Sequence, residues 1–296
     1  HKPDKIGDHF LGALHREGGH QQRPARPMGL PDHIGQHAPA RGRVHRRSLD
    51  AVRRQLDVGL KIQVVDRAFV PTFVFTGKDL VVTVGQDGLV ANVAKYVGAQ
   101  PVVAVNPDPE RFDGVLLPFP PAQTRQAVRA VLDGKARIRQ VTLAEAVLND
   151  GQRLLAFNDF FIGVRSHGSA RYRITVDGKS EPQSSSGVLV STGAGSTGWL
   201  SSVFHMAAGV AAFTGQSRVK PLRLSLEDPR LVFVVREPFV SRHSQAGIVA
   251  GTLARGKELT LESLTPTGGA LFSDGIEADY VEFNSGATVR IRAAPR

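Results

Sequence analysis

The sequence contains one segment whose residue types and order could bind and transfer a phosphate. The apolar run 80–84 leads directly into Gly85-Gln86-Asp87-Gly88, and residues 89–97 then have a helical pattern. A glycine turn between a strand and a helix brings backbone N–H groups to a phosphate. Asp87 adds a carboxylate, which repels phosphate unless it acts as a catalytic base or holds Mg²⁺. The same residues also suit an ordinary tight turn, so this segment alone leaves both interpretations open.

A second candidate segment is the run of hydroxyl and glycine residues from 191 to 198. It follows the apolar run 187–190 and precedes a predicted helix, 199–210. Its backbone N–H groups and short hydroxyls could contact the sugar and phosphates of a nucleotide, whereas the alternative is a flexible surface linker. The candidate binding residues here are Thr192, Gly195, Ser196, Thr197, Gly198 and Trp199, whose indole could stack on a base.

The elements that would position these segments change in type near residue 137. Between residues 49 and 136, predicted strands alternate with predicted helices, which indicates a Rossmann-like α/β nucleotide-binding domain with a parallel sheet. The functional loops of such a sheet lie at the carboxyl ends of its strands, where Gly85 is found. The strands are expected at 60–65, 80–84 and 101–105, and the helices at 49–58, 89–97 and 122–132.

Residues 137–296 are β-rich and predict a second domain, with a cleft between the two. Asp177-Gly178 after an alternating run is typical of a hairpin turn. Another polar pair, Asn158-Asp159, follows the apolar run 153–157. The strands are expected at 137–143, 153–157, 171–176, 187–190, 222–226, 231–235, 248–253, 258–261, 270–272 and 288–291.

Residues 1–48 differ from the rest of the chain. Seven of the ten histidines fall here, arginine and proline are dense, and neither a period of 2 nor one of 3.6 persists. We expect an irregular basic segment, either a disordered arm or an out-of-frame translation, with Ser48 as the N-cap of the helix 49–58. The histidine spacings fit no closed set of metal ligands.

Composition limits the classes of function. The 296 residues carry a formal charge of +10, which favours anionic partners, but one Trp and three Tyr provide little for a nucleic-acid platform, so nucleic acid is an unlikely partner. The absence of cysteine excludes disulfides, thiolate metal sites and cysteine nucleophiles, and it fits a cytoplasmic protein. No apolar run is long enough to span a membrane.

Five short motifs between residues 79 and 292 occur in the order found in the NAD kinases, relatives of the diacylglycerol and sphingosine kinases, and the chain resembles that family. The family's Gly-Gly-Asp-Gly corresponds to residues 85–88, its Asn-Glu pair to 158–159, and its Ser/Thr/Gly loop to 190–199. Its last two motifs correspond to 238–244 and 273–275. Gln86 and Trp199 depart from the family pattern.

The resemblance implies an α/β domain, a β-sandwich domain and a nucleotide site in the cleft between them. It implies phosphorylation of NAD at the 2′-hydroxyl of the adenosine ribose, with ATP or polyphosphate as donor, Mg²⁺ entering with ATP, and a homodimer or tetramer. Asp87 would be the catalytic base. The implied nucleotide- and substrate-binding residues are Gly85, Gln86, Gly88, Asn158, Asp159, Thr192, Gly195, Ser196, Thr197, Gly198 and Trp199. A related kinase of a lipid or other hydroxyl compound, and a catalytically inactive nucleotide-binding protein, are the alternatives.

Overall fold

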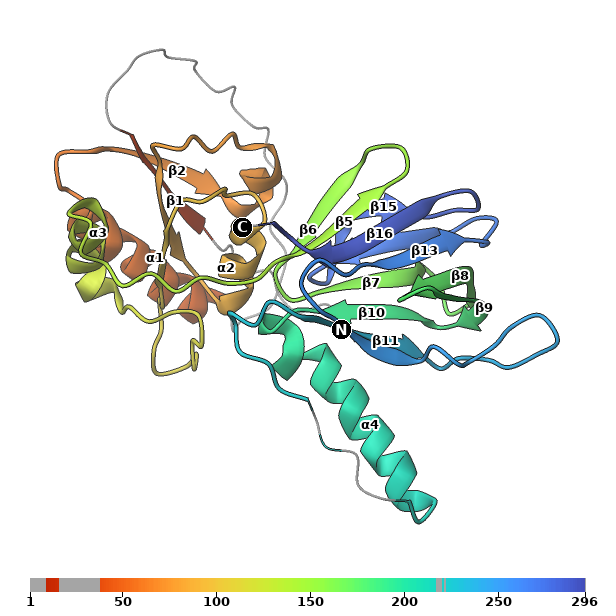
Figure 1. Ribbon diagram of the computed structural model, residues 1–296. Helices are drawn as coiled ribbons and strands as arrows, with labels where there is room; N and C mark the ends of the chain where they lie inside the picture. Colours follow the sequence, from red (N-terminus) through yellow and green to blue (C-terminus); the bar gives the residue numbers. More distant parts are fainter. Residues whose placement is uncertain (1–8, 16–37, 217–219, 221, 296) are drawn as a thin grey trace. The chain divides into compact units, whose positions relative to one another are not determined.

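The computed structural model describes residues 9–15, 38–216, 220 and 222–295, which form two compact units, 1–138 and 139–296 (Figure 1). The first unit is an α/β domain. Its sheet has the order β2-β1-β3-β4, and β3 and β4 pair in parallel. The elements of this unit are β1 (His9–His15), β2 (Lys61–Asp66), β3 (Leu80–Val84), β4 (Val102–Val105), α1 (Ala38–Gln55), α2 (Asp87–Ala94) and α3 (Thr124–Leu132), with short 3₁₀ helices η1 (Arg67–Thr72) and η2 (Pro121–Gln123).

Strand β3 is the centre of this unit because every one of its five side chains is buried. Successive side chains of a strand point to opposite faces of the sheet. Leu80, Val82 and Val84 pack with residues of α1 and α3, whereas Val81 packs with Leu89 and Val93 of α2. Helices therefore cover both faces, as the continuous apolar run predicts for a buried strand.

Residues 1–48 were expected to form no regular element, which is wrong for residues 9–15 and 38–48; residues 1–8 and 16–37 lie outside the described residues. Strand β1 lies inside the sheet and pairs antiparallel with both β2 and β3, so the sheet is mixed rather than purely parallel. Register shifts within β1 interrupt its pairing, so this strand has no regular two-residue period. Helix α1 begins at Ala38, eleven residues before the expected start at residue 49, with Pro39 in its first turn, where proline is tolerated. Ser48 lies inside this helix and donates to the carbonyl of Pro107 at 2.6 Å instead of capping.

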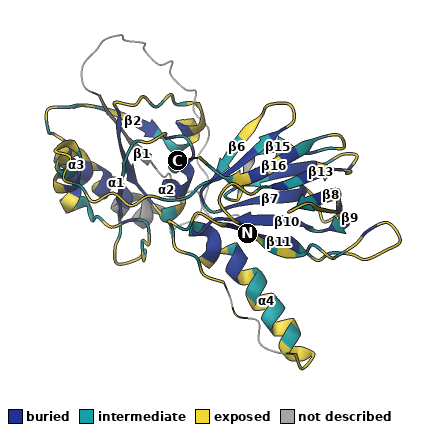
Figure 2. Cartoon of the chain, viewed as in Figure 1, coloured by how far each residue is buried: buried dark blue, intermediate teal, exposed yellow. Residues whose placement is uncertain are grey.

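The second unit is a β-sandwich of two six-stranded antiparallel sheets. One sheet has the order β12-β11-β10-β7-β14-β15 and the other β6-β5-β16-β13-β8-β9. Their inner faces share one core, to which Phe160 and Phe233 contribute from the first sheet and Tyr172 and Leu261 from the second (Figure 2). The strands are β5 (Ala144–Leu148), β6 (Arg153–Ala156), β7 (Asp159–Val164), β8 (Ala170–Val176), β9 (Lys179–Ser185), β10 (Gly187–Ser191), β11 (Leu231–Arg236), β12 (Ala250–Leu253), β13 (Leu259–Ser263), β14 (Gly269–Ser273), β15 (Ile276–Glu282) and β16 (Thr288–Ala293).

One helix, α4 (Trp199–Phe213), follows β10 through the 3₁₀ turn η3 (Ala194–Thr197). The first turn of α4 packs on the outer face of the first sheet, where Leu200 meets Leu189 and Val232. Figure 1 shows the rest of the helix extending past the edge of the sandwich.

The hairpin predicted at Asp177-Gly178 is present, and both residues have positive φ, 48° and 76°. Two predicted strands, 137–143 and 222–226, are absent from the described residues of those segments. These segments are joined instead by a backbone bond from Thr142 N–H to the carbonyl of Leu226 at 3.0 Å. Four strands, β5, β7, β9 and β15, lie outside the predicted strand ranges; residues 159–164 of β7 are largely buried on both faces and therefore lack alternation.

Candidate functional site

The first motif lies where β3 ends and α2 begins. Helix α2 starts at Asp87, two residues earlier than the sequence predicted, and Gln86 is its N-cap. The carboxylate of Asp87 is half-buried, and its Oδ1 accepts a hydrogen bond of 2.6 Å from the N–H of Leu116, in the loop that follows β4. Gly88 is exposed, and a Cβ at this position would have no heavy atom within 4 Å. The turn thus fixes one oxygen of Asp87 and leaves open space beside it.

The second motif, Asn158-Asp159, joins β6 to β7. Its backbone groups are hydrogen-bonded on both sides. The carboxylate of Asp274, in the turn between β14 and β15, accepts hydrogen bonds from the N–H groups of Phe157, Asn158 and Asp159 at 3.0, 2.6 and 3.2 Å. From the other side, the N–H of Thr192 donates to the carbonyl of Asn158 at 2.9 Å. No hydrogen bond of the Asn158 side chain is found within the described ranges, so that amide is available to a ligand.

The carboxyl group of Asp159 is 7% exposed. Burial, and secondarily the negative charge of Asp274, raise the pKa of Asp159 from 3.8 to about 7. Because burial disfavours the charged form, this carboxyl is half-protonated near neutral pH. It can therefore donate a hydrogen bond as well as accept one.

The hydroxyl-rich loop is tightly packed at its beginning and open at its end. The hydroxyl of Thr192 donates to the carbonyl of Phe157 at 2.5 Å, and Gly195 packs so closely on the carbonyl of Asn158 that a Cβ would overlap it. The hydroxyl of Ser196 donates to the carbonyl of Gly193 at 2.7 Å and accepts from the N–H of Leu224 at 3.1 Å. Thr192, Gly195 and Ser196 therefore stabilise the conformation of the loop itself. The residues left facing solvent are Thr197 and Gly198, which are exposed, and Trp199, which is partly exposed.

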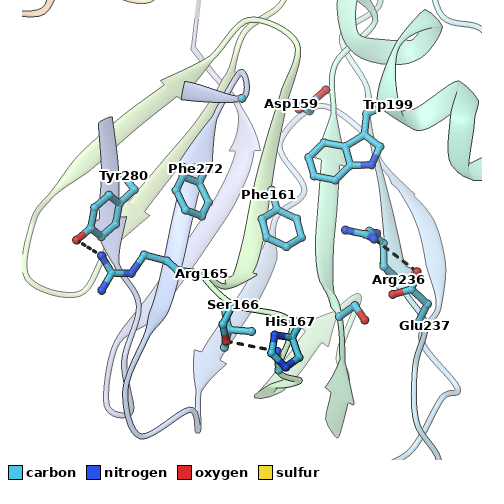
Figure 3. A pocket seen from close by; sticks show the side chains of 14 residues that line it. Asp159, Phe161, Arg165, Ser166, His167, Trp199, Arg236, Glu237, Phe272 and Tyr280 are labelled. Carbon is cyan, nitrogen blue, oxygen red and sulfur yellow. Dashed lines mark hydrogen bonds and ion pairs between the residues drawn. The ribbon is translucent and has the colours of Figure 1, made fainter. Parts of the chain in front are cut away.

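A pocket of about 710 Å³ lies within the second unit and includes both Asp159 and Trp199 (Figure 3). Four aromatic rings stand side by side across its floor, with centroid distances of 5.3, 6.3 and 5.7 Å between successive rings. In order, they are those of Trp199, Phe161, Phe272 and Tyr280. Such a row offers a flat apolar surface on which a base can stack.

Two arginines stand beside this aromatic row: Arg236 against the rings of Trp199 and Phe161, and Arg165 against the ring of Tyr280. The guanidinium of Arg236 lies 5.4 Å from the Trp199 ring, and that of Arg165 lies 4.8 Å from the Tyr280 ring. Arg165 also donates to the Tyr280 hydroxyl at 2.6 Å. Flat rings with two cations complement the bases and phosphates of a nucleotide.

The pocket residues Phe161, Phe272 and the two arginines were not among the predicted site residues. A signal for Phe161 was present. Phe161 follows Asp159 by two residues, and residues two apart on a strand point to the same face.

Two further features, a metal-binding cluster and a membrane-spanning helix, are absent from the described residues. The described part of the chain contains no group of three or more His, Cys, Asp or Glu side chains arranged to hold a metal ion. Nor does any helix in the described ranges combine the length and apolar character needed to cross a membrane.

No protein-family model matches the chain. The chain is 27% identical to NAD kinase 2, mitochondrial, of Rattus norvegicus, over 68% of this chain and 64% of the relative. It is 28% identical to the protein of the same name from Homo sapiens, over 66% of this chain and 59% of the relative. The chain thus spans less than two thirds of the length of either relative.

The fold is also that of a solved structure, yeast NADH kinase complexed with NADH. The TM-score is 0.53 at 20% identity, with 73% of this chain and 58% of the yeast chain covered. The predicted fold class, an α/β unit followed by a β-rich unit, is therefore confirmed. The chain is thus similar in sequence to NAD kinase 2 and similar in fold to yeast NADH kinase.

Proposed function

We propose that the protein phosphorylates NAD at the 2′-hydroxyl of the adenosine ribose to form NADP, with ATP or polyphosphate as phosphate donor. The observation that carries this proposal is the geometry of Asp87. Its Oδ1 is held by the N–H of Leu116, and among the described residues its Oδ2 accepts no hydrogen bond. A carboxylate held by one oxygen keeps the other oriented toward a reacting hydroxyl.

In the proposed reaction, Asp87 takes the proton of the acceptor hydroxyl. The hydroxyl oxygen then forms a bond to the γ-phosphorus of ATP, the bond from that phosphorus to the β–γ bridging oxygen breaks, and ADP leaves. Such a transfer needs positioning and charge neutralisation more than covalent catalysis. Gly85 and Gly88 would let the backbone approach the phosphates, with Gln86 beside them.

The second unit would bind the acceptor. The free amide of Asn158 and the half-protonated carboxyl of Asp159 suit ribose hydroxyls, which both donate and accept hydrogen bonds. Trp199 would stack on a base, next to the exposed Thr197 and Gly198. Thr192, Gly195 and Ser196 would contribute by shaping the loop.

Magnesium does not fit a site made of protein side chains alone, since the described residues contain no cluster of three carboxylate or histidine ligands. Mg²⁺ would therefore enter bound to the phosphates of ATP. A homodimer or tetramer and a cytoplasmic location complete the proposal. The molar mass in solution and the location of the tagged protein in cells would test these two points.

The decisive experiment is incubation with ATP, Mg²⁺ and NAD, followed by assay for NADP with a dehydrogenase that requires it. Asp87→Asn should reduce turnover about 100-fold or more while NAD binding is retained, since general-base contributions are commonly of that size. Asp57→Asn is the matched control, because Asp57 is exposed in the same unit. Full activity of Asp87→Asn would refute the assignment of the base. Binding of NAD without NADP formation by the unmodified protein would indicate a nucleotide-binding protein instead.

A further inference from the structure

The turn between β14 and β15 has a backbone conformation that few residues adopt. Asp274 has φ of 54° and the following Gly275 has φ of 69°, and Ser273 pairs with Ile276 across the two-residue turn. Asp and Asn tolerate this left-handed conformation better than other side chains. The turn therefore accepts an aspartate, but it does not by itself need the carboxylate.

The carboxylate of Asp274 is instead directed at a segment 115 to 117 residues earlier in the chain. It accepts the three consecutive N–H groups of Phe157, Asn158 and Asp159, and the N–H of Asp274 donates to the carbonyl of Asp159 at 2.9 Å. Beside it, the hydroxyl of Ser273, which is fully buried, donates to the carbonyl of Leu155 at 2.6 Å. Hydrogen bonds to a charged acceptor are stronger than those between neutral groups. The turn between β14 and β15 therefore holds the backbone of residues 157–159 in place.

The opposite side of the same segment is held by Thr192. Its N–H donates to the carbonyl of Asn158, and its hydroxyl donates to that of Phe157. Both backbone groups of Asn158 are thus fixed, the N–H by Asp274 and the C=O by Thr192. The Asn158 side chain is the part of this residue that remains for a ligand.

The carboxylate of Asp274 also acts on the carboxyl of Asp159 through its charge, which adds to the effect of burial in raising the pKa of Asp159. The other charged groups around Asp159 line the same pocket. They are Arg236 and Glu237 at the end of β11, and Arg165 and His167 in the loop after β7. Removing the charge of Asp274 should therefore lower the pKa of Asp159.

We propose that Asp274 is a positioning residue for the acceptor nucleotide, whose carboxylate fixes the backbone of Asn158 and Asp159 for contact with the substrate. This inference rests on the proposed function, because it concerns the same site. Asp274 acts through these two residues and is not itself a catalytic residue.

The test compares Asp274→Asn with Asp177→Asn. Asp177 is a matched control, since it occupies an Asp-Gly turn with φ of 48° and its exposed carboxylate pairs with the exposed Lys257 at 3.1 Å. In Asp274→Asn, the side chain loses its charge and one acceptor atom. We expect KM for NAD to rise about tenfold and KM for ATP to change less than about twofold, as for loss of charged hydrogen bonds on the acceptor side. Asp177→Asn should change neither.

Two further readouts do not depend on turnover. Amide hydrogen exchange of Asn158 should accelerate in Asp274→Asn, and a carbon-13 NMR titration should show a lower pKa for Asp159. Asp274→Gly, which suits the positive φ and removes the carboxylate entirely, is a second variant in which both effects should be larger.

The outcomes separate this inference from the proposed function. If the unmodified protein makes no NADP, the proposed function fails, whereas amide exchange and the Asp159 titration still decide whether Asp274 fixes this segment. If Asp274→Asn matches Asp177→Asn in KM for NAD, amide exchange and titration, the inference is overturned. An equal rise in KM for NAD and in KM for ATP, with the pKa of Asp159 unchanged, would also overturn it. That result would indicate a general structural defect.

Discussion

Replacing Asp159 with Asn should stabilise the protein above neutral pH. In the native structure, the Asp159 carboxyl is 7% exposed and accepts no hydrogen bond among the described residues, while Asp274 adds a neighbouring negative charge. Above neutral pH this group must be ionised in an environment that disfavours the ion. Asparagine keeps the shape of the side chain and removes that cost.

The magnitude follows from linkage between protonation and folding. Raising the pKa from 3.8 to about 7 is a shift of about three units, and at 1.36 kcal/mol per unit this amounts to about 4 kcal/mol when the group is fully ionised. Because the folded-state pKa is raised, the stability due to the protonated form is fully present below the unfolded value. It is lost as the pH rises through 7.

The assay is urea unfolding followed by circular dichroism at pH 5 and pH 8. The stability gained by Asp159→Asn should be greater at pH 8 than at pH 5 by roughly 2 to 3 kcal/mol. Asp228→Asn is a control of opposite sign, because the hydrogen bond from Arg230 lowers the pKa of Asp228, so its removal should reduce stability at pH 8. Equal effects of Asp159→Asn at the two pH values would refute the reasoning.

Two further predictions concern the loop before α4. Gly193→Ala should cost about 2 kcal/mol or more in a thermal melt, because its Cβ would overlap the carbonyl of Ser225, whereas Gly209→Ala, with open space around it in α4, should be neutral or stabilising by about 0.5–1 kcal/mol. Equal melting temperatures for the two variants would contradict this. Ser196→Ala should cost about 1–2 kcal/mol of stability, because it leaves the Leu224 N–H unpaired, with KM for NAD nearly unchanged. A large rise in KM with unchanged stability would instead show direct contact between Ser196 and the substrate.

The strands flanking the motifs could be predicted because burial leaves a strong pattern. The run 80–84 and the Asp177-Gly178 turn were predicted where the structure has them. The opening strand and helix were missed, because register shifts in β1 break its period and α1 begins in a proline-containing basic stretch. Local sequence patterns carry no information about the strand pairing and packing that stabilise β1 and α1.

The residues of the candidate site were likewise predicted only in part. The sequence singled out Asp87, Asp159 and Trp199 by their motifs, and the structure places the last two in one pocket. The sequence could not show that Thr192 and Ser196 direct their hydroxyls into the loop itself, because this depends on carbonyls contributed by distant segments. Arg165 and Arg236 have no motif, since their role arises only from the pairing of strands.

The position of Trp199 also makes the pocket visible by spectroscopy. Trp199 is the single tryptophan of the chain, and its ring lies beside both the Phe161 ring and the Arg236 guanidinium. All indole emission therefore originates at one wall of this pocket, where both neighbours and solvent affect it. The chain carries a built-in optical probe at its candidate binding surface, and occupancy of that surface can be followed without a label, even in variants that catalyse nothing.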